Sequence, residues 1–247
     1  MTRPTQIAPA ELMGPVLPSG VAELRAIAVA TLSGAVSVDG RSHTLGNATD
    51  FALLNALRDW SDVVLVGANT ARAENYFGVR STPEQRRARA LRGQAEIPPI
   101  ATIARSLEFD TSAQLFWNTA VPPVILAPHA SLTDDRLAYR RAQLTDAGAE
   151  LVDTGSGSAA EIVAALRDRG FARITCEGGP EIYSLMFHAG VVDKLHLTLA
   201  PLVNAPVEHN LLAPRPDGTP YSQEIILEDA RATDDSLLFL RYGKKRA

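Results

Sequence analysis

A polar segment directly after an apolar run is the first place where this sequence could do chemistry. Residues 62–67 (DVVLVG) are mostly apolar and end in glycine, and residues 67–74 (GANTARAE) continue as a polar turn. Thr70 and Glu74 are four residues apart, so they share a face if a helix begins there. They could line a ligand site, or they could be a helix cap and a solvated acid. The spacing alone leaves both interpretations open.

The segment Glu177-Gly178-Gly179-Pro180 is the second place. Two glycines let a backbone approach a ligand closely, and Pro180 presets the first turn of a helix. The exposed N–H groups at a helix start attract phosphate. The alternative is a tight turn between a strand and a helix. An acid directly before two glycines, at the end of a buried strand, favours a functional site.

A third segment, residues 153–160, fits the dinucleotide fingerprint G-x-G-x-x-A through Gly155, Gly157 and Ala160. Glu177 follows about twenty residues later, as that fingerprint requires. However, the strand before the match is short and polar, and little chain remains for the rest of a dinucleotide domain. Ser158 is also explained as a helix cap. We therefore favour a surface loop and keep the Rossmann site as the competing interpretation.

Other catalytic chemistries find little support. The five histidines have no metal-binding spacing, so no metal site is predicted. Cys176 is the only cysteine, which excludes an intramolecular disulfide and a thiolate zinc cage. It lies in an apolar run and is expected to be a small buried hydrophobe. No nucleophile elbow or Walker motif occurs.

The elements that must position these residues alternate along the chain. Strands are expected near residues 22–32, 62–67, 99–104, 121–127, 150–152, 173–176 and 194–200. Helices are expected over residues 49–60, 83–92, 133–147, 158–169 and 180–189. This alternation predicts an α/β fold with a mainly parallel sheet flanked by helices. Two last strands, near 224–227 and 237–242, predict a C-terminal antiparallel hairpin that makes the sheet mixed.

Local signals predict several helix starts and one helix surface. Thr49 or Asp50 could cap the helix that ends near Trp60. Thr82 begins a plausible capping box with proline at the first helical position. The basic run made by Arg86, Arg87, Arg89 and Arg92 is typical of a solvated helix face.

Composition bounds the function classes. The chain has 247 residues, and 24 Lys+Arg against 28 Asp+Glu give a net charge of −4. It is 46% hydrophobic and 21% charged, which predicts a globular protein rather than a disordered one. A mildly acidic chain is a poor candidate for nucleic-acid binding. No apolar run reaches the ~20 residues that span a bilayer, and the Pro-rich start does not resemble a signal peptide. We expect a cytoplasmic protein without membrane contact, with a Pro-rich tail or strap at 1–20 and a single domain at 21–247.

Several segments together resemble the RibD C-terminal family, the reductase part of bifunctional riboflavin-biosynthesis proteins, which has the dihydrofolate-reductase-like fold. In family order, the matching segments are residues 30–34 (ATLSG), 38–42 (VDGRS), 57–58, 62–70, 73–80 and 177–195, followed by Ala200-Pro201. The resemblance runs from about Arg25 to Tyr242 and is closest to stand-alone actinobacterial members. Because the zinc deaminase needs H-x-E and P-C-x-x-C, neither of which occurs here, we expect the reduction alone.

The resemblance implies an NADPH-dependent reduction of 5-amino-6-(5-phosphoribosylamino)uracil to the ribitylamino product, with hydride transfer to C1′ of the ribosyl group. It implies Glu74 as the catalytic acid and Ser42, Arg80 and Glu177 as substrate-binding residues. Arg105 and Ser106 would bind the ribose 2′-phosphate of the cofactor. The full set of implied cofactor-binding residues is Thr44, Gly67, Thr70, Glu74, Arg105, Ser106, Gly178, Gly179, Pro180, Glu181 and Ile182.

Two departures from the family pattern leave the substrate open. Ser33 stands where the family commonly has Asp, and Glu74-Asn75-Tyr76 stands where an Asp and an Asp-Pro are frequent. A related pterin or pyrimidine could therefore be the substrate, with weak dihydrofolate reductase activity, or the chain could bind NADPH without turnover. Family members commonly form homodimers, so a homodimer is also expected.

Overall fold

The computed structural model describes residues 3–214 and 218–245, and the chain forms two compact units. Unit 1 consists of residues 1–18, 23–57 and 175–247, and unit 2 of residues 19–22 and 58–174. The predicted segments 1–20 and 21–247 include residues 1–2, 215–217 and 246–247, which lie outside the described residues. The chain passes from unit 2 to unit 1 within strand β6 (Arg173–Gly178).

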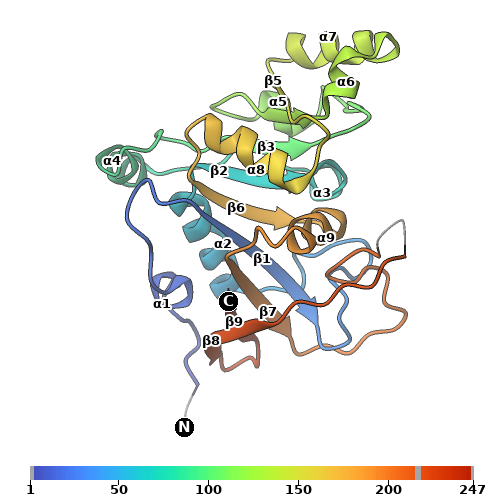
Figure 1. Cartoon of the computed structure of the whole chain (residues 1–247). Helices are drawn as coiled ribbons and strands as arrows, with labels where there is room; N and C mark the ends of the chain where they lie inside the picture. The colour runs from blue at the N-terminus through green and yellow to red at the C-terminus, as the bar shows by residue number, and fades with distance from the viewer. Residues whose placement is uncertain (1–2, 215–217, 246–247) are drawn as a thin grey trace. The chain divides into compact units, whose positions relative to one another are not determined.

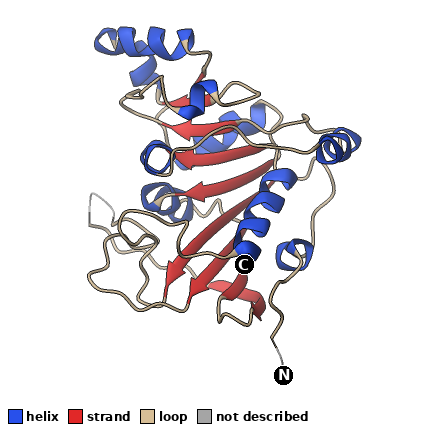
Figure 2. Ribbon diagram, turned by 180° about the vertical axis from the view of Figure 1, so that it is seen from behind, coloured by secondary structure: helices blue, strands red, loops and turns tan. Residues whose placement is uncertain are grey.

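Unit 1 holds the mixed part of the sheet, in the strand order β6-β1-β7-β9-β8. Its other strands are β1 (Glu23–Thr31), β7 (Lys194–Ala200), β8 (Ile225–Ala232) and β9 (Leu238–Lys244). β1 pairs in parallel with β7, whereas β9 pairs antiparallel with both β7 and β8. The predicted C-terminal hairpin is therefore confirmed. Seen from opposite sides, Figures 1 and 2 place α2 (Ala48–Trp60) and α9 (Pro180–His188) on opposite faces of these strands.

The Pro-rich N-terminal segment packs on unit 1. It contains the short helix α1 (Pro9–Met13), and the side chains of Ile7, Leu12 and Met13 are buried. Leu12 and Leu53 line the same small cavity, so α1 lies on the α2 side of the sheet. Burial of these apolar side chains gives the segment a hydrophobic attachment.

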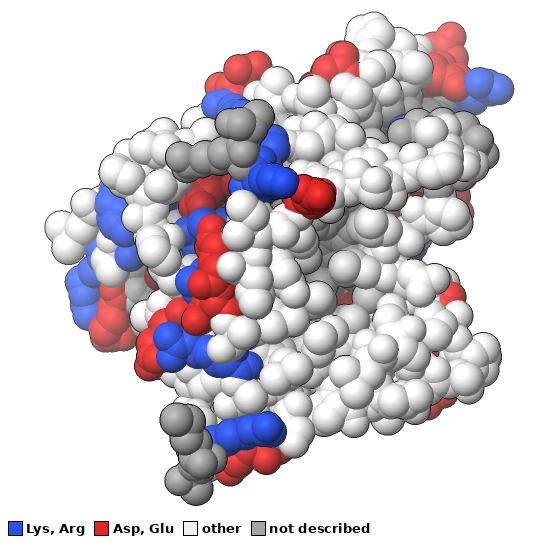
Figure 3. Space-filling view, turned by 60° about the horizontal axis from the view of Figure 1, so that its bottom comes forward, with Lys and Arg blue, Asp and Glu red and all other residues white. Residues whose placement is uncertain are grey.

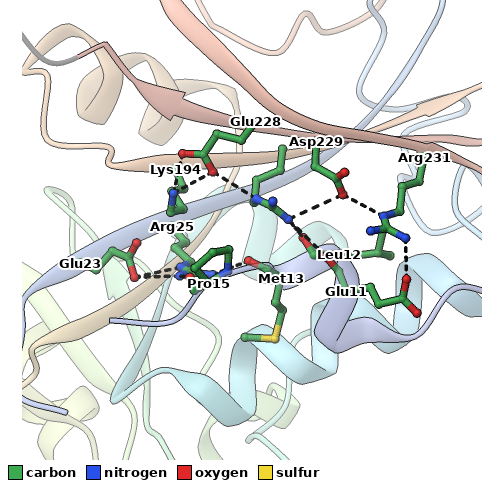
Figure 4. Close-up of polar contacts among 11 residues, drawn as sticks. Glu11, Leu12, Met13, Pro15, Glu23, Arg25, Lys194, Glu228, Asp229 and Arg231 are labelled. Atoms are coloured by element: carbon green, nitrogen blue, oxygen red, sulfur yellow. Dashed lines mark hydrogen bonds and ion pairs between the residues drawn. The ribbon is translucent and has the colours of Figure 1, made fainter. Parts of the chain in front are cut away.

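Two buried arginines also hold this segment by its backbone (Figure 4). Arg25 is fully buried and pairs with Glu23 at 2.9 Å. Its Nη1 and Nη2 donate to the carbonyl oxygens of Met13 and Pro15 at 2.8 and 2.7 Å. Arg241 donates to the Leu12 carbonyl at 2.8 Å. The guanidinium donors thus satisfy carbonyls that the short segment cannot pair by itself.

Unit 2 holds the parallel part of the sheet, in the order β5-β4-β3-β2. The strands are β2 (Val63–Gly67), β3 (Ile100–Ile103), β4 (Val124–Ala127) and β5 (Glu150–Asp153), and each neighbouring pair is parallel. All residues of β2 and β4 are buried, as expected for strands covered on both faces. The helices are α3 (Ala68–Ala73), α4 (Pro83–Leu91), α5 (Gln114–Trp117), α6 (His129–Thr133), α7 (Ala138–Asp146) and α8 (Ala159–Asp168).

The capping boxes of unit 2 follow the sequence. Thr82 accepts from the Gln85 N–H while the Gln85 side chain accepts from the Thr82 N–H, as predicted. Ser158 and Glu161 form the same reciprocal pair at α8. Two orphan N–H groups are satisfied at each helix start.

Three local predictions were wrong. The helix expected over 133–147 is divided into α6, a 3₁₀ turn (Asp135–Leu137) and α7, because Asp134 is extended and its carboxylate accepts the Arg136 N–H at 2.9 Å. The helix start at α2 is capped by Asn47, whose side chain accepts the Asp50 N–H at 3.0 Å, and neither Thr49 nor Asp50 is the cap.

The third error concerns the basic run on α4. Arg89 is fully buried rather than solvated. Its guanidinium donates to the carbonyl oxygens of Asp59, Ser61 and Ala95 at 2.5, 2.9 and 2.8 Å. Carbonyl groups at the end of a helix such as α2 lack donors within the helix, and the buried Arg89 side chain supplies those donors.

Candidate active site

The predicted site residues fall into one group in each unit. In unit 2, β2 ends at Gly67, which is the N-cap of α3. The Glu74 N–H donates to the Thr70 carbonyl at 3.0 Å, so both side chains lie on one helical turn, the case in which their spacing gives a shared face. Both are partly buried, and Asn75 ends the turn in the left-handed region at φ +49. Thr70 and Glu74 thus lie just after the carboxyl end of a buried parallel strand, where ligands bind in such sheets.

Arg80 follows the same turn, and its guanidinium is held in place. Its Nη2 donates to the backbone and side-chain oxygens of Asn118, and it lies 5.5 Å from the Phe77 ring centroid. Asn118 is itself fixed by donation to the Gln114 side chain at 2.6 Å. Sequence analysis missed Asn118, because its link to Arg80 spans 38 residues. An exposed arginine with fixed orientation suits a phosphate.

Arg105 and Ser106 follow strand β3 and are both exposed. Their position is the carboxyl end of a neighbouring parallel strand, β3 being paired with β2 through Gly67 and Ile103. Unit 2 therefore brings the α3 residues and this pair to the same edge of its sheet.

In unit 1, β6 ends in the predicted Glu177-Gly-Gly-Pro turn, and α9 begins at Pro180. Glu177 is buried, with 8% of its surface exposed. Gly178 has φ +75, and a Cβ placed there would lie 2.2 Å from the Tyr183 ring. The Tyr183 hydroxyl donates to the Ile27 carbonyl, so the ring cannot move away easily. Only glycine fits at this position.

The start of α9 has the geometry of a phosphate site. The Gly178–Gly179 peptide is cis, and the Gly179 carbonyl accepts from the N–H groups of Ile182 and Tyr183 at 2.9 Å each. Pro180 has no N–H, and because the Ile182 and Tyr183 N–H groups already donate to the Gly179 carbonyl, the Glu181 N–H is the donor of the first turn that a helical carbonyl cannot reach. A nine-residue helix adds the positive end of its dipole. Glu181 is exposed and Ile182 is buried.

Ser42 and Thr44 lie in a loop of unit 1 between β1 and α2. The loop is turned by Asp39 and Gly40, both with positive φ, between the paired backbones of Val38 and Arg41. Ser42 is partly buried and its carbonyl accepts from the Leu45 N–H at 2.9 Å. Thr44 is exposed.

Ser33, which stands where the family resemblance led us to expect Asp, bonds to a neighbouring loop. Its hydroxyl donates to the Asn204 side-chain oxygen at 2.9 Å and accepts the Asn204 N–H at 2.8 Å. Thr31 donates to the same oxygen at 2.8 Å. These bonds tie the loop after β1 to the segment after β7, both within unit 1.

Asp50 is a partly buried acid in unit 1, which the sequence analysis treated only as a possible cap. Burial raises the pKa of its carboxyl, and the Thr198 hydroxyl, which donates to it at 2.5 Å, offsets the shift only in part. No motif marks it; only the fold brings α2 and β7 together here.

The RibD C-terminal domain family model matches residues 27–204, more than half of the chain. The chain belongs to the RibD C-terminal domain family. The family, together with the 29% identical pyrimidine reductase-like protein described below, indicates a reductase. A search of curated proteins gave no match.

Solved structures support the fold of this RibD C-terminal domain. A pyrimidine reductase-like protein from Corynebacterium diphtheriae is 29% identical with a TM-score of 0.85, covering 97% of this chain and 99% of that one. Acinetobacter baumannii RibD is 16% identical with a TM-score of 0.70, and the match covers 92% of this chain but 59% of that one. The riboflavin biosynthesis reductase Rib7 of Saccharomyces cerevisiae is 13% identical with a TM-score of 0.61, covering 94% and 93%. The expected α/β fold with its mainly parallel sheet is thus confirmed.

The competing Rossmann fingerprint in this RibD C-terminal domain is occupied by the chain's own carboxylate. Glu161 accepts from the N–H groups of Ser156 and Ser158 at 3.2 Å each and from the Ser158 hydroxyl at 2.7 Å. The side-chain bonds from Ser156 and Ser158, with their backbone N–H groups, lower the pKa of Glu161 to about 2. These are the N–H groups that a pyrophosphate would need, so the surface-loop interpretation holds.

Replacing Gly157 with valine should therefore leave the Kd for NADPH within about threefold of wild type, while thermal stability falls. Gly157 has φ +78, and a Cβ there would lie 2.9 Å from the Pro128 ring. Strain and crowding of this kind cost about 1–3 kcal/mol. Isothermal titration with NADPH, beside a thermal melt, measures both quantities. Loss of NADPH affinity in a folded variant would restore the Rossmann interpretation.

Other features of the described residues give no sign of metal, thiol or membrane chemistry. Within residues 3–214 and 218–245, no three His, Cys, Asp or Glu side chains are grouped as metal ligands. Cys176 is fully buried, and burial raises the pKa of its thiol to about 12, so it is inert as a nucleophile. Among these same residues no helix is long and apolar enough to cross a bilayer. The face in Figure 3 carries its acidic and basic side chains in mixed groups beside a broad uncharged area.

Proposed function

We propose that the chain is an NADPH-dependent reductase of 5-amino-6-(5-phosphoribosylamino)uracil that forms the ribitylamino product of riboflavin biosynthesis. The observation that carries this proposal is the Gly178-Gly179-Pro180 turn between β6 and α9. It occurs in a chain that belongs to the RibD C-terminal domain family. The pyrimidine reductase-like protein of C. diphtheriae, which matches over nearly its whole length, supports the choice of a pyrimidine.

The residues present fit NADPH. The start of α9 offers the Glu181 N–H and the positive end of the helix dipole to the pyrophosphate, and a side chain at Gly178 would close the approach. Arg105 and Ser106 offer a cation and a hydroxyl to the 2′-phosphate. Gly67, Thr70 and Glu74 would line the nicotinamide. When bound, the cofactor supplies a hydride.

The protein's part in the reaction is mainly positioning. Ring opening of the phosphoribosyl group gives an imine, whose C1′ takes the hydride while its nitrogen takes a proton. Glu74 is the acid that we place nearest to C1′. Arg80 would bind the substrate phosphate, and Ser42 and Glu177 would orient the sugar and the pyrimidine. Thr44 would contact the cofactor. Holding two reactants in register accounts for much of the rate in such reactions.

The test is substrate-dependent oxidation of NADPH by the wild-type chain, followed by absorbance, with the product identified by mass spectrometry. Formation of the ribitylamino compound supports the proposal. NADPH binding without turnover of this substrate contradicts it and favours a binding module. Turnover of dihydrofolate or another pterin instead would favour the second candidate. That candidate is motivated by Ser33, which stands where the family resemblance implies an aspartate. The Ser33 hydroxyl is hydrogen-bonded to Asn204.

Replacing Arg80 with alanine should raise the KM for the phosphoribosyl substrate by about ten- to a hundredfold, because a charged hydrogen bond to phosphate is lost. The Kd for NADPH should stay unchanged. Arg87→Ala is the matched control, since it removes an exposed charge that pairs with Glu84 on α4. Equal KM values in the two variants would remove Arg80 from the substrate site.

We also propose a cytoplasmic homodimer. The edge strand β8 supports the dimer, because Ile226 and Leu227 are 52% and 51% exposed there.

A further inference from the structure

The loop 105–108, which carries Arg105 and Ser106, is braced within unit 2 from two helices. Arg140 on α7 donates from Nη1 to the Ser106 carbonyl at 2.8 Å. Arg72 on α3 donates from Nη1 to the Glu108 carbonyl at 2.8 Å. The Arg72 guanidinium is fixed in turn by the Asn69 side chain at 2.5 Å. Two backbone carbonyls of this loop are therefore held by donors from two different helices.

The loop also has a fixed internal shape. Leu107 is 1% exposed and packs in the hydrophobic core of unit 2, while its φ of +52 lies in the left-handed region that non-glycine residues rarely adopt. The Ser106 hydroxyl accepts from the Glu108 N–H at 3.4 Å. Because Leu107 is anchored inward, Arg105 and Ser106 are turned out to solvent. A strained conformation persists only where neighbours enforce it, and Arg140 is such a neighbour.

Charge gives Arg140 a second effect on this loop. Its Nη2 lies 3.6 Å from the Glu108 carboxylate. Glu108 is the acid nearest in sequence to the proposed 2′-phosphate binders, and an uncompensated carboxylate there would repel a phosphate dianion. The Arg140 guanidinium offsets part of the Glu108 charge while it donates to the Ser106 carbonyl.

We propose that Arg140 is a positioning residue for cofactor specificity: it holds loop 105–108 in the conformation that receives the 2′-phosphate and so makes the chain prefer NADPH to NADH. The proposal rests on the function proposed above and extends it to a residue on α7 that no motif indicated. It acts through Ser106 and Arg105, which touch the phosphate.

The test uses two adenosine ligands that need neither substrate nor turnover. Adenosine 2′,5′-bisphosphate carries the 2′-phosphate, and adenosine 5′-monophosphate lacks it. In Arg140→Met we expect the Kd of the bisphosphate to rise about tenfold or more, with the Kd of the monophosphate unchanged. Arg140→Lys should recover part of the affinity, since it keeps the charge and one donor. In Arg140→Met the Kd for NADPH divided by the Kd for NADH should rise in step, because only the ligand with the 2′-phosphate loses affinity.

The control is Arg136→Met, which removes the same charge from the preceding 3₁₀ turn, where Arg136 is exposed and pairs with Asp134. It should leave both Kd values unchanged. Adding Glu108→Gln to Arg140→Met should restore part of the bisphosphate affinity, because the repelling carboxylate is gone. A thermal melt of each variant checks that it is folded.

The outcomes separate this inference from the proposed function. Wild-type affinity for the bisphosphate in Arg140→Met overturns the role of Arg140 but leaves NADPH-dependent reduction intact. An equal loss for both ligands also overturns it, since that loss is structural. If the wild-type chain itself binds both ligands equally, the 2′-phosphate site is wrong, and the assay with NADH decides whether a reductase remains.

Discussion

Replacing Glu74 with glutamine should lower kcat for the proposed reduction by about 10²- to 10⁴-fold, the range for loss of a general acid or base. Glutamine keeps the size of the side chain but can neither carry charge nor give up a proton. Glu74 is held on one helical turn with Thr70 at the end of β2, so the substitution should not move the backbone. The Kd for NADPH should change by less than about threefold, because the pyrophosphate and 2′-phosphate contacts lie elsewhere.

Pre-steady-state oxidation of bound NADPH, with saturating substrate, measures this effect directly. Glu84→Gln, an exposed acid on α4, is the control for loss of one negative charge in the same unit. A kcat for Glu74→Gln within threefold of the control would mean that positioning alone supplies the rate. A large rise in KM at unchanged kcat would instead make Glu74 a binding residue.

Glu74 also shows how far sequence reasoning reaches. The apolar run 62–67 predicted a buried strand that ends in a polar turn, and the structure has β2 there. Helix α3 after it was considered only as one possibility. The capping box at Thr82 and the helix cap at Ser158 were predicted correctly because their partners lie within three residues. Such local signals are decided by the backbone of one segment.

Long-range contacts were not readable in the same way. Arg89 was expected to be solvated, but it is buried because three carbonyls near the end of α2 and after α4 need donors. The break at Asp134 arises from a side chain that competes with the helix, which periodicity does not report. Spacing indicates which residues share an element, whereas the fold decides which elements meet.

The candidate site shows the same difference between local signals and long-range contacts. Its motif residues were found from the sequence and from family resemblance, but the residues that hold them were not. Asn118 contacts Arg80 across 38 residues, and Arg140 contacts Ser106 across 34. Asp50 became notable only through burial and its bond to Thr198. Positioning residues carry no motif of their own, because their effect depends on distance in space.

Replacing Gly178 with alanine should destabilise the protein by about 2–5 kcal/mol and weaken NADPH binding. Left-handed backbone costs alanine about 1–2 kcal/mol, and overpacking adds about 1–3 kcal/mol. The crowding is specific, since the new Cβ would lie 2.2 Å from the ring of Tyr183, which is tethered to Ile27. Relief requires α9 to shift, and the shift moves the helix start that we assign to the pyrophosphate.

The matched control is at the other end of the same helix. Gly190 also has positive φ, +62, but a Cβ there would have only the flexible end of Lys244 near it, at 3.8 Å. Gly190→Ala should therefore show the backbone cost alone, about 1–2 kcal/mol in urea unfolding, with unchanged NADPH affinity. If Gly178→Ala is too unstable to purify, the double variant with Tyr183→Leu removes the ring and should recover stability. Equal losses at Gly178 and Gly190 would show that the turn has no need for a close approach, and the pyrophosphate assignment would then lose its main support.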